Sequence, residues 1–221
     1  MAKNQSNEEK KAIISYMTLR KLVGFMGFLF PFILFFGARW IGGYGIQKSI
    51  SAYYHTNMGD VFVGILFVVG IFLFAYKGHG LFDNILGFFS CIFALGTAIC
   101  PTAPEGNVLK LYQTIGTWHF ICATLFFLTL IIFSLFLFTK THKDKPPSKR
   151  KKTRNKIYRF CGIMMFLCII MIGLYHVLNL DETTLANINP VFWLESLALG
   201  FFGISWFTKG EAILWDPKNA E

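Results

Sequence analysis

Charged residues are scarce in this chain of 221 residues. Asp, Glu, Lys and Arg together make up only 15% of it, whereas 54% is hydrophobic and 26 residues are phenylalanine. A soluble domain of this length would expose too much of that apolar surface to water. The composition therefore excludes an ordinary soluble fold and indicates a protein of the lipid bilayer.

The sequence has no CxxC motif, and we expect no removable leader. It starts with the polar stretch MAKNQSNEEKK, and no short apolar core precedes a small-residue cleavage site. We expect the first transmembrane helix to act as its own insertion signal. The cysteines all lie in apolar runs, namely Cys91, Cys100, Cys122, Cys161 and Cys168. We expect buried small side chains rather than metal ligands or disulfides, with Cys100 and Cys122 the one pair that could interact.

Six apolar runs approach or reach the length of about 20 residues that a helix needs to cross the hydrocarbon core. They cover approximately residues 22–41, 61–76, 81–100, 118–139, 157–178 and 190–208. The runs are solidly apolar, whereas the strands of a membrane barrel alternate. The prediction is thus an all-α fold, a single polytopic bundle of six transmembrane helices. The second run is the shortest and could borrow residues from the connector before it.

The basic residues predict the orientation of the bundle. If the amino terminus is cytoplasmic, all but three of the 21 Lys and Arg residues lie on the inside, and the exceptions are Arg39, Lys48 and Lys110. The positive-inside rule then places both termini in the cytoplasm, with the chain in the cell (inner) membrane. The basic loop 140–156 is expected to fix this topology and to contact anionic lipid headgroups. The net charge of +9 therefore requires no nucleic-acid partner.

Polar residues of the chemically useful kinds gather at the outer ends of these helices. The segment SISAYYHTNMGD enters the second helix, a histidine opens the fourth, another closes the fifth, and a glutamate lies in the sixth, about 7 to 8 Å below its outer end. The residues are Ser51, His55, Asp60, His119, His176 and Glu195. Their common level makes a shared site possible.

Each candidate also has a structural explanation. Asp60 directly precedes an apolar run, where a carboxylate caps free N–H groups and meets the positive end of the helix dipole. Single histidines such as His119 and His176 are common anchors at the membrane interface. Glu195 differs, because an ionisable group inside the bilayer is costly and is by default a functional candidate. A hydrogen bond between helices is its alternative role.

Several segments resemble an uncharacterised family of bacterial multi-pass membrane proteins. The matching segments are SISAYYHTNMGDVFVG, the PT after the third helix, HFICATLFF, and LESLALGFFGISWFTKGE. The residues that carry the resemblance are Ser51, Tyr53, Tyr54, Thr56, Asp60, Pro101, Thr102, His119, Glu195 and Ser205. The resemblance implies a helical membrane bundle and carries no activity.

A weaker resemblance is to the CREST superfamily of membrane hydrolases, which includes alkaline ceramidases. Ser51 and His55 have the Ser-x-x-x-His spacing of that superfamily, and Asp60 follows them. The resemblance implies zinc held by an Asp and histidines at one membrane face, with His119 and His176 at the matching level. The chain departs from the pattern because its last helix has no His-x-x-x-His pair and its Asp comes too soon after the histidine.

Three classes of function stay open. The first is a hydrolase or transferase acting on a lipid or amphiphile at the outer face. His55, His119 and His176 would hold zinc with an open position for water, while Asp60 or Glu195 moves protons. Without a metal, His119 and Glu195 could act as a general acid and base.

The other two classes need no reaction. In a transporter or small-molecule binder Glu195 would be the protonatable group of an outward cavity, although the sequence has no evident inverted repeat. In a structural or assembly protein the polar residues form a hydrogen-bonded plug. Convergence of His119, His176 and Glu195 would favour chemistry. Pairing of the same side chains with nearby backbone, without a cavity, would favour the plug.

Overall fold

The computed structural model describes residues 2–76, 80–104, 106, 109–140, 148–212 and 214, with side chains from residue 17 onward. All secondary-structure elements in the described part of the chain are helices, and it holds no strand. Its α-helices are α1 (Ala2–Gly42), α2 (Gly59–Ala75), α3 (Leu81–Ile99), α4 (Lys110–Ile132), α5 (Lys149–Val177) and α6 (Pro190–Lys209). The all-α prediction is confirmed.

Within the described residues, five helical segments are long and apolar enough to cross a membrane. They are Met17–Gly42, Leu81–Ile99, Lys110–Leu137, Lys149–Val177 and Pro190–Lys209. Helix α2 is equally apolar but has only 17 residues, in keeping with the prediction that the second run is the shortest. Phe, Ile and Leu side chains on the outside of the bundle remain exposed, as expected where lipid replaces water as the solvent.

Several helices are longer than their apolar runs. Helix α1 starts at Ala2, and α4 starts at Lys110 instead of near residue 118. The segment 140–156, expected as a basic loop, is helical from Lys149 onward, where α5 begins; residues 141–147 lie outside the described part. Ser148 explains that start, since its hydroxyl accepts a 3.1 Å hydrogen bond from the Lys151 N–H and caps the helix. Apolar composition marks the span, whereas caps set the helix ends.

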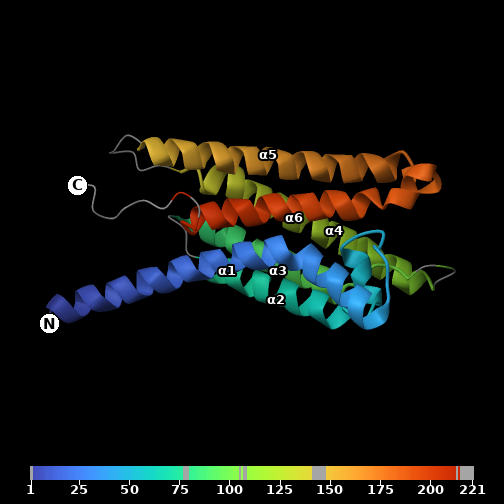
Figure 1. Ribbon diagram of the computed structural model, residues 1–221, viewed down its shortest axis with the longest axis horizontal. Coiled ribbons are helices and arrows are strands. Elements are labelled where there is room, and N and C mark those ends of the chain that lie inside the picture. The colour runs from blue at the N-terminus through green and yellow to red at the C-terminus, as the bar shows by residue number, and fades with distance from the viewer. Residues whose placement is uncertain are drawn as a thin grey trace.

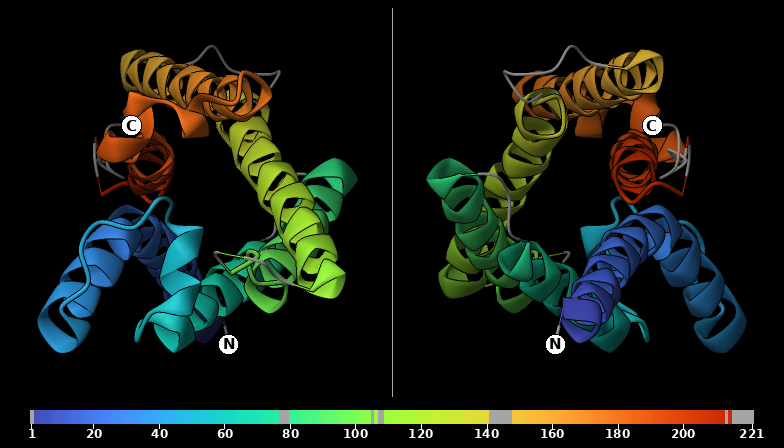
Figure 2. Two further views of the ribbon diagram at one scale, coloured as in Figure 1. Left: turned by 90° about the vertical axis from the view of Figure 1, so that its right-hand side faces the viewer. Right: turned by 90° about the vertical axis from the view of Figure 1, so that its left-hand side faces the viewer.

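The six helices form a ring. Each packs against the helix before and after it in the chain, and α6 packs against α1 to close the ring (Figures 1 and 2). The start of α1 and the end of α6 lie at the same end of the bundle, which we name the basic end (Figure 1). The opposite end carries residues 43–58 and 178–189, and we name it the connector end.

Helices α1 and α6 approach closely because glycine removes the side chain from both at one crossing. A Cβ atom at Gly203 would lie 2.8 Å from the carbonyl oxygen of Gly24 and 2.7 Å from the Cβ of Phe28. Such distances are shorter than real contacts, so only glycine fits. This crossing joins the first helix to the last and therefore closes the ring.

We predict that Gly203→Ala destabilises the protein. The added methyl group would separate α1 from α6, at a cost of about 1–3 kcal/mol for overpacking. Gly200→Ala is the matched control, because a Cβ at Gly200 would meet nothing within 4 Å and alanine favours the helix. Thermal unfolding of both variants in detergent measures the difference. Equal melting temperatures would contradict the close crossing.

Candidate functional site

The connector between α1 and α2 is fastened to the start of α6. The Ile50 N–H donates a 2.6 Å hydrogen bond to Oε2 of Glu195, and the Phe192 N–H donates a 3.1 Å bond to the Lys48 carbonyl oxygen. The connector then forms a short 3₁₀ helix, η1 (Ser51–His55). Since these bonds join residues far apart in sequence, they fix the position of η1 over the connector end.

Tyr53 anchors η1 from below. Its side chain is fully buried, its ring lies 6.1 Å from that of Phe192, and its hydroxyl accepts a hydrogen bond from the Gln47 N–H at 3.4 Å. Burial raises the pKa of the Tyr53 hydroxyl, and the Gln47 bond opposes that shift only in part. The phenol therefore stays neutral and serves packing.

Glu195 and Ser51 lie beside the same small space. Both line an internal cavity of about 30 Å³, together with Thr97 of α3 and apolar side chains such as Phe62 and Phe126. This volume is close to that of one or two water molecules. The Thr97 hydroxyl donates to the Phe93 carbonyl oxygen at 2.8 Å. The space around Glu195 is therefore too small for a substrate.

His119 is buried in α4 and binds the end of α3. Its Nδ1 lies 2.6 Å from the carbonyl oxygen of Cys100, the residue that follows α3. Because a carbonyl can only accept, Nδ1 carries the proton, and Nε2 is left as an acceptor with no hydrogen-bond partner among the described residues. The imidazole thus satisfies one of the carbonyls that a helix leaves open at its C-terminus.

His55 and His176 line a larger space, which we name the connector cavity. It has a volume of about 570 Å³ and lies between the two connectors and the adjoining ends of α4, α5 and α6. Its polar lining residues include Lys48, His55, Tyr175, His176, Asp181 and Asn189. Nε2 of His55 donates to the Thr102 carbonyl oxygen at 2.8 Å, and the His176 ring lies 5.9 Å from that of Phe120.

Asp60 lies apart from these groups. It is exposed in the first turn of α2 and lines neither cavity. The prediction that Asp60 caps α2 was wrong, because α2 begins at Gly59, one residue before Asp60, and no side chain caps its start. Its carboxylate keeps only the favourable position near the positive end of the helix dipole.

The structure offers no ligand set for zinc. In the described part of the chain, which includes all three predicted ligands, no three His, Cys, Asp or Glu side chains are placed so that they could hold a metal ion. His55 and His176 share a cavity, but His119 lies buried outside it. Cys100 and Cys122 are free thiols. The side chains present therefore do not fit the proposed metal.

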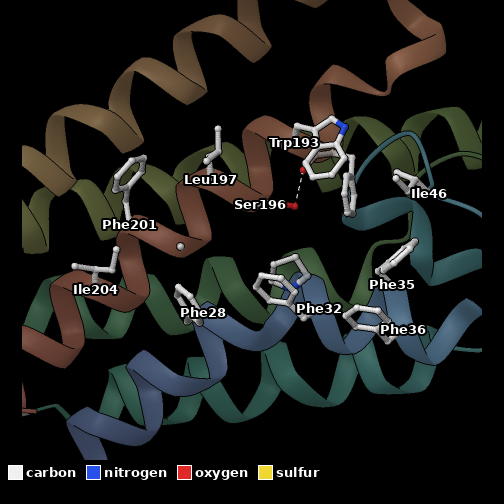
Figure 3. A pocket seen from close by; sticks show the side chains of 13 residues that line it. Phe28, Phe32, Phe35, Phe36, Ile46, Trp193, Ser196, Leu197, Phe201 and Ile204 are labelled. Atoms are coloured by element: carbon white, nitrogen blue, oxygen red, sulfur yellow. Dashed lines mark hydrogen bonds between the residues drawn. The ribbon is translucent and has the colours of Figure 1, made fainter.

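A third space lies between α1 and α6 and has a different character. This groove of about 470 Å³ is lined by aromatic and aliphatic side chains from both helices, such as Phe28, Phe32, Leu197 and Phe201 (Figure 3). The one hydroxyl in its wall, that of Ser196, donates to the Phe192 carbonyl oxygen at 2.7 Å (Figure 3). The groove therefore presents apolar surface and no reactive group.

Comparisons of the chain with protein-family models, with curated proteins and with solved structures give no match. The two resemblances described above therefore stay predictions from the sequence.

The sequence did not reveal three members of the connector cavity. Asp181 and Asn189 reach it because the chain turns sharply between α5 and α6, whereas Lys48 reaches it from the connector between α1 and α2. Asn179 and Asn189 make those turns in the left-handed region, with φ of 50° and 49°. Asparagine adopts this conformation more readily than most residues, and Pro190 follows as the first residue of α6. This Asn-Pro pair was the available signal for a tight turn beside the site.

We predict that two substitutions of Glu195 differ in their effect on stability. Glu195→Gln keeps an oxygen that can accept the Ile50 N–H, so the melting temperature should change little. Glu195→Leu removes the acceptor and leaves a buried donor unpaired, which costs about 1–3 kcal/mol. Thermal unfolding in detergent tests both. Glu182→Leu, at an exposed position of the same end, is the control and should be nearly neutral.

Proposed function

We propose that this chain is a multi-pass membrane protein that binds the polar head of an amphiphile in the connector cavity. The observation that carries the proposal is a cavity of about 570 Å³ whose wall contains one positive side chain, Lys48, and one negative side chain, Asp181. Two histidines, His55 and His176, also line it. Binding sites for small molecules commonly have volumes of about 300–1,000 Å³ and a few convergent polar groups.

An amphiphile fits this place better than a wholly polar solute. The cavity opens at the end of the apolar spans, where headgroups lie. Phe120 and Val191 contribute apolar wall beside the polar groups, and the Phe120 side chain is also exposed on the outside of α4. A molecule with its head in the cavity can thus keep its chain in the lipid beside α4.

Binding is supported better than hydrolysis or group transfer. Glu195 and His119, the expected acid and base, each hydrogen-bond a backbone group of another segment, and they lie outside the connector cavity. These two hydrogen bonds agree with the structural alternative, in which the polar residues form a plug. The connector cavity does not agree with it, because a plug would leave no cavity at this end. We therefore assign the polar residues of this end to two tasks. Glu195, His119 and His55 hold segments together, and His176 and Asp181 contribute to binding.

We further propose that all six α-helices cross the membrane, with the connector end outside and the basic end in the cytoplasm. Helix α2 completes the ring between α1 and α3, and its two ends lie near the levels at which its longer neighbours end (Figure 1). The distribution of Lys and Arg favours this orientation. The connector cavity would then face the outside of the cell (inner) membrane.

The binding proposal predicts a selective loss in one of two matched variants. We expect a zwitterionic lysolipid, lysophosphatidylethanolamine, to raise the melting temperature of the purified full-length chain. Asp181→Asn should weaken the affinity for the lysolipid, obtained from the dependence of the melting temperature on its concentration, about tenfold. Asp60→Asn removes the same charge from the same end but outside the cavity, and should leave the affinity unchanged. Glycerophosphoethanolamine is the soluble headgroup of the same lipid. Comparing it with the lysolipid shows whether binding needs the acyl chain or the headgroup alone. A response of equal size in both variants would contradict the proposed site.

The topology proposal predicts the side on which each terminus lies. Six crossings put both termini on one side, whereas five crossings, with α2 lying outside the membrane, put them on opposite sides. Fusions of a fluorescent protein that folds only in the cytoplasm, made separately to each terminus, should both fluoresce. A phosphatase that is active only outside should be active when inserted at Gly106, between α3 and α4.

A further inference from the structure

Cationic side chains from three helices, together with one that follows α4, gather at the basic end. They are Arg20 of α1, Lys151 and Arg154 of α5, Lys209 of α6, and Lys140. Lys209 interacts electrostatically with Arg20, Lys151 and Arg154, so these charges lie close together. Lys140 forms an ion pair with the buried Asp83 of α3.

The cations lie over buried aromatic rings instead of pointing into solvent. The Arg20 guanidinium is 5.3 Å from the centroid of the Tyr76 ring, and Nζ of Lys209 is 5.3 Å from that of Phe138. Nζ of Lys151 is 5.8 Å from the Tyr158 centroid. All three rings are almost completely buried. Aromatic faces attract cations and offset part of the hydration that these cations lose.

Backbone groups hold this arrangement in place. Residues Phe133–Leu137 form a π-helical turn, η2, at the end of α4, and π-helical turns often occur at functional sites. Just after it, the Phe138 carbonyl oxygen accepts a 2.9 Å hydrogen bond from Nζ of Lys151. The Asn155 amide donates to the Thr139 carbonyl oxygen at 3.3 Å. The end of α4 is thus bound to α5 beneath the charges.

The described part of this cluster carries more positive than negative charge. Its carboxylates are Asp83, paired with Lys140, and Glu211, whose Oε1 lies 3.4 Å from Nη1 of Arg154. Lys151 and Lys209 add two further cations close to Arg154. Holding like charges together out of water costs free energy, and an anion bound beside Lys151 and Lys209 would offset that cost.

A buried donor gives an independent indication of a ligand. Trp206 is 1% exposed, and its indole Nε1–H has no acceptor among the described residues. The indole ring lies 5.3 Å from the Tyr76 ring and 5.2 Å from the Phe138 ring, the same rings that lie beneath Arg20 and Lys209. An unsatisfied buried donor is costly, so an oxygen-rich acceptor in this place would be stabilising.

We propose that the basic end binds a phosphate group, with Lys151 and Lys209 as its cationic ligands. Phosphate oxygens accept hydrogen bonds from several Lys and Arg side chains at once. The cluster lies where the apolar spans end, which is the level of phospholipid headgroups. This site is distinct from the connector cavity, since the two lie at opposite ends of the bundle (Figure 1).

The test uses the full-length chain in a maltoside detergent, which contains no phosphate. Native mass spectrometry measures the binding of phosphatidylglycerol, of diacylglycerol with the same chains, and of inorganic phosphate at constant ionic strength. We expect phosphatidylglycerol to bind at least about tenfold more tightly than diacylglycerol. Phosphatidylglycerol without inorganic phosphate would identify a lipid headgroup site, and binding of both would identify a site open to free phosphate. No preference for either phosphate compound would overturn the proposal.

Matched variants test the residues. Lys209→Gln should weaken phosphatidylglycerol binding about tenfold, and Lys209→Arg should retain it. Lys151→Gln is a second variant of the site, and Lys152→Gln is its control, because Lys152 is the next residue on α5 and is exposed. Equal binding by the Lys151 and Lys152 variants would show that only overall charge matters and would reject the site. If neither site variant folds, the comparison of phosphatidylglycerol with diacylglycerol on the unaltered chain still decides the question.

Discussion

Polar groups inside a bilayer must find their partners within the protein, because no water reaches them there. The hydrogen bond from the Ile50 N–H to Glu195 meets that constraint at the point where the first connector descends onto α6. The bond from His119 to the Cys100 carbonyl meets it at the end of α3. Glu195 was a functional candidate from the sequence, because an ionisable group inside a membrane is costly. In this protein the hydrogen bonds that close the bundle offset the free-energy cost of burying these groups.

That closure determines the shape of the connector end. Glu195 and the Lys48 carbonyl hold the first connector against the start of α6, so η1 lies over the helices and His55 reaches Thr102. The turns at Asn179 and Asn189 bring the second connector to the same level. The connector cavity is the space that remains between these two fastened segments. A binding role for His176 and Asp181 therefore depends on a structural role for Glu195.

The sequence predicted the helices well, because the requirement for about 20 apolar residues acts on each run separately. It predicted helix ends less well. Ser148 caps α5 inside what composition marked as a basic loop, and α4 starts eight residues before its apolar run. Caps depend on single residues and on the local backbone, whereas hydropathy averages over a window. The residues added at these helix ends lie outside the apolar runs, so hydropathy does not predict them as helix.

The site was harder to predict, because its contacts join distant segments. Ile50 and Glu195 are 145 residues apart, and nothing in either segment specifies the other. The sequence placed the polar residues at one level, and Ser51 and Glu195 line the same small space. Level alone does not give rotation about a helix axis. His119 and His176 are both at the connector end, but one side chain is buried and the other lines the cavity.

The two ends of the bundle treat charge in opposite ways, and that difference itself favours one orientation. The connector cavity combines Lys48 with Asp181, whereas the basic end concentrates cations over Tyr76, Phe138 and Tyr158. An anionic leaflet lowers the free energy of such a cluster and offers little to a cavity of mixed charge. The cations held by the folded basic end therefore support the proposed orientation, in addition to the charges of the loops.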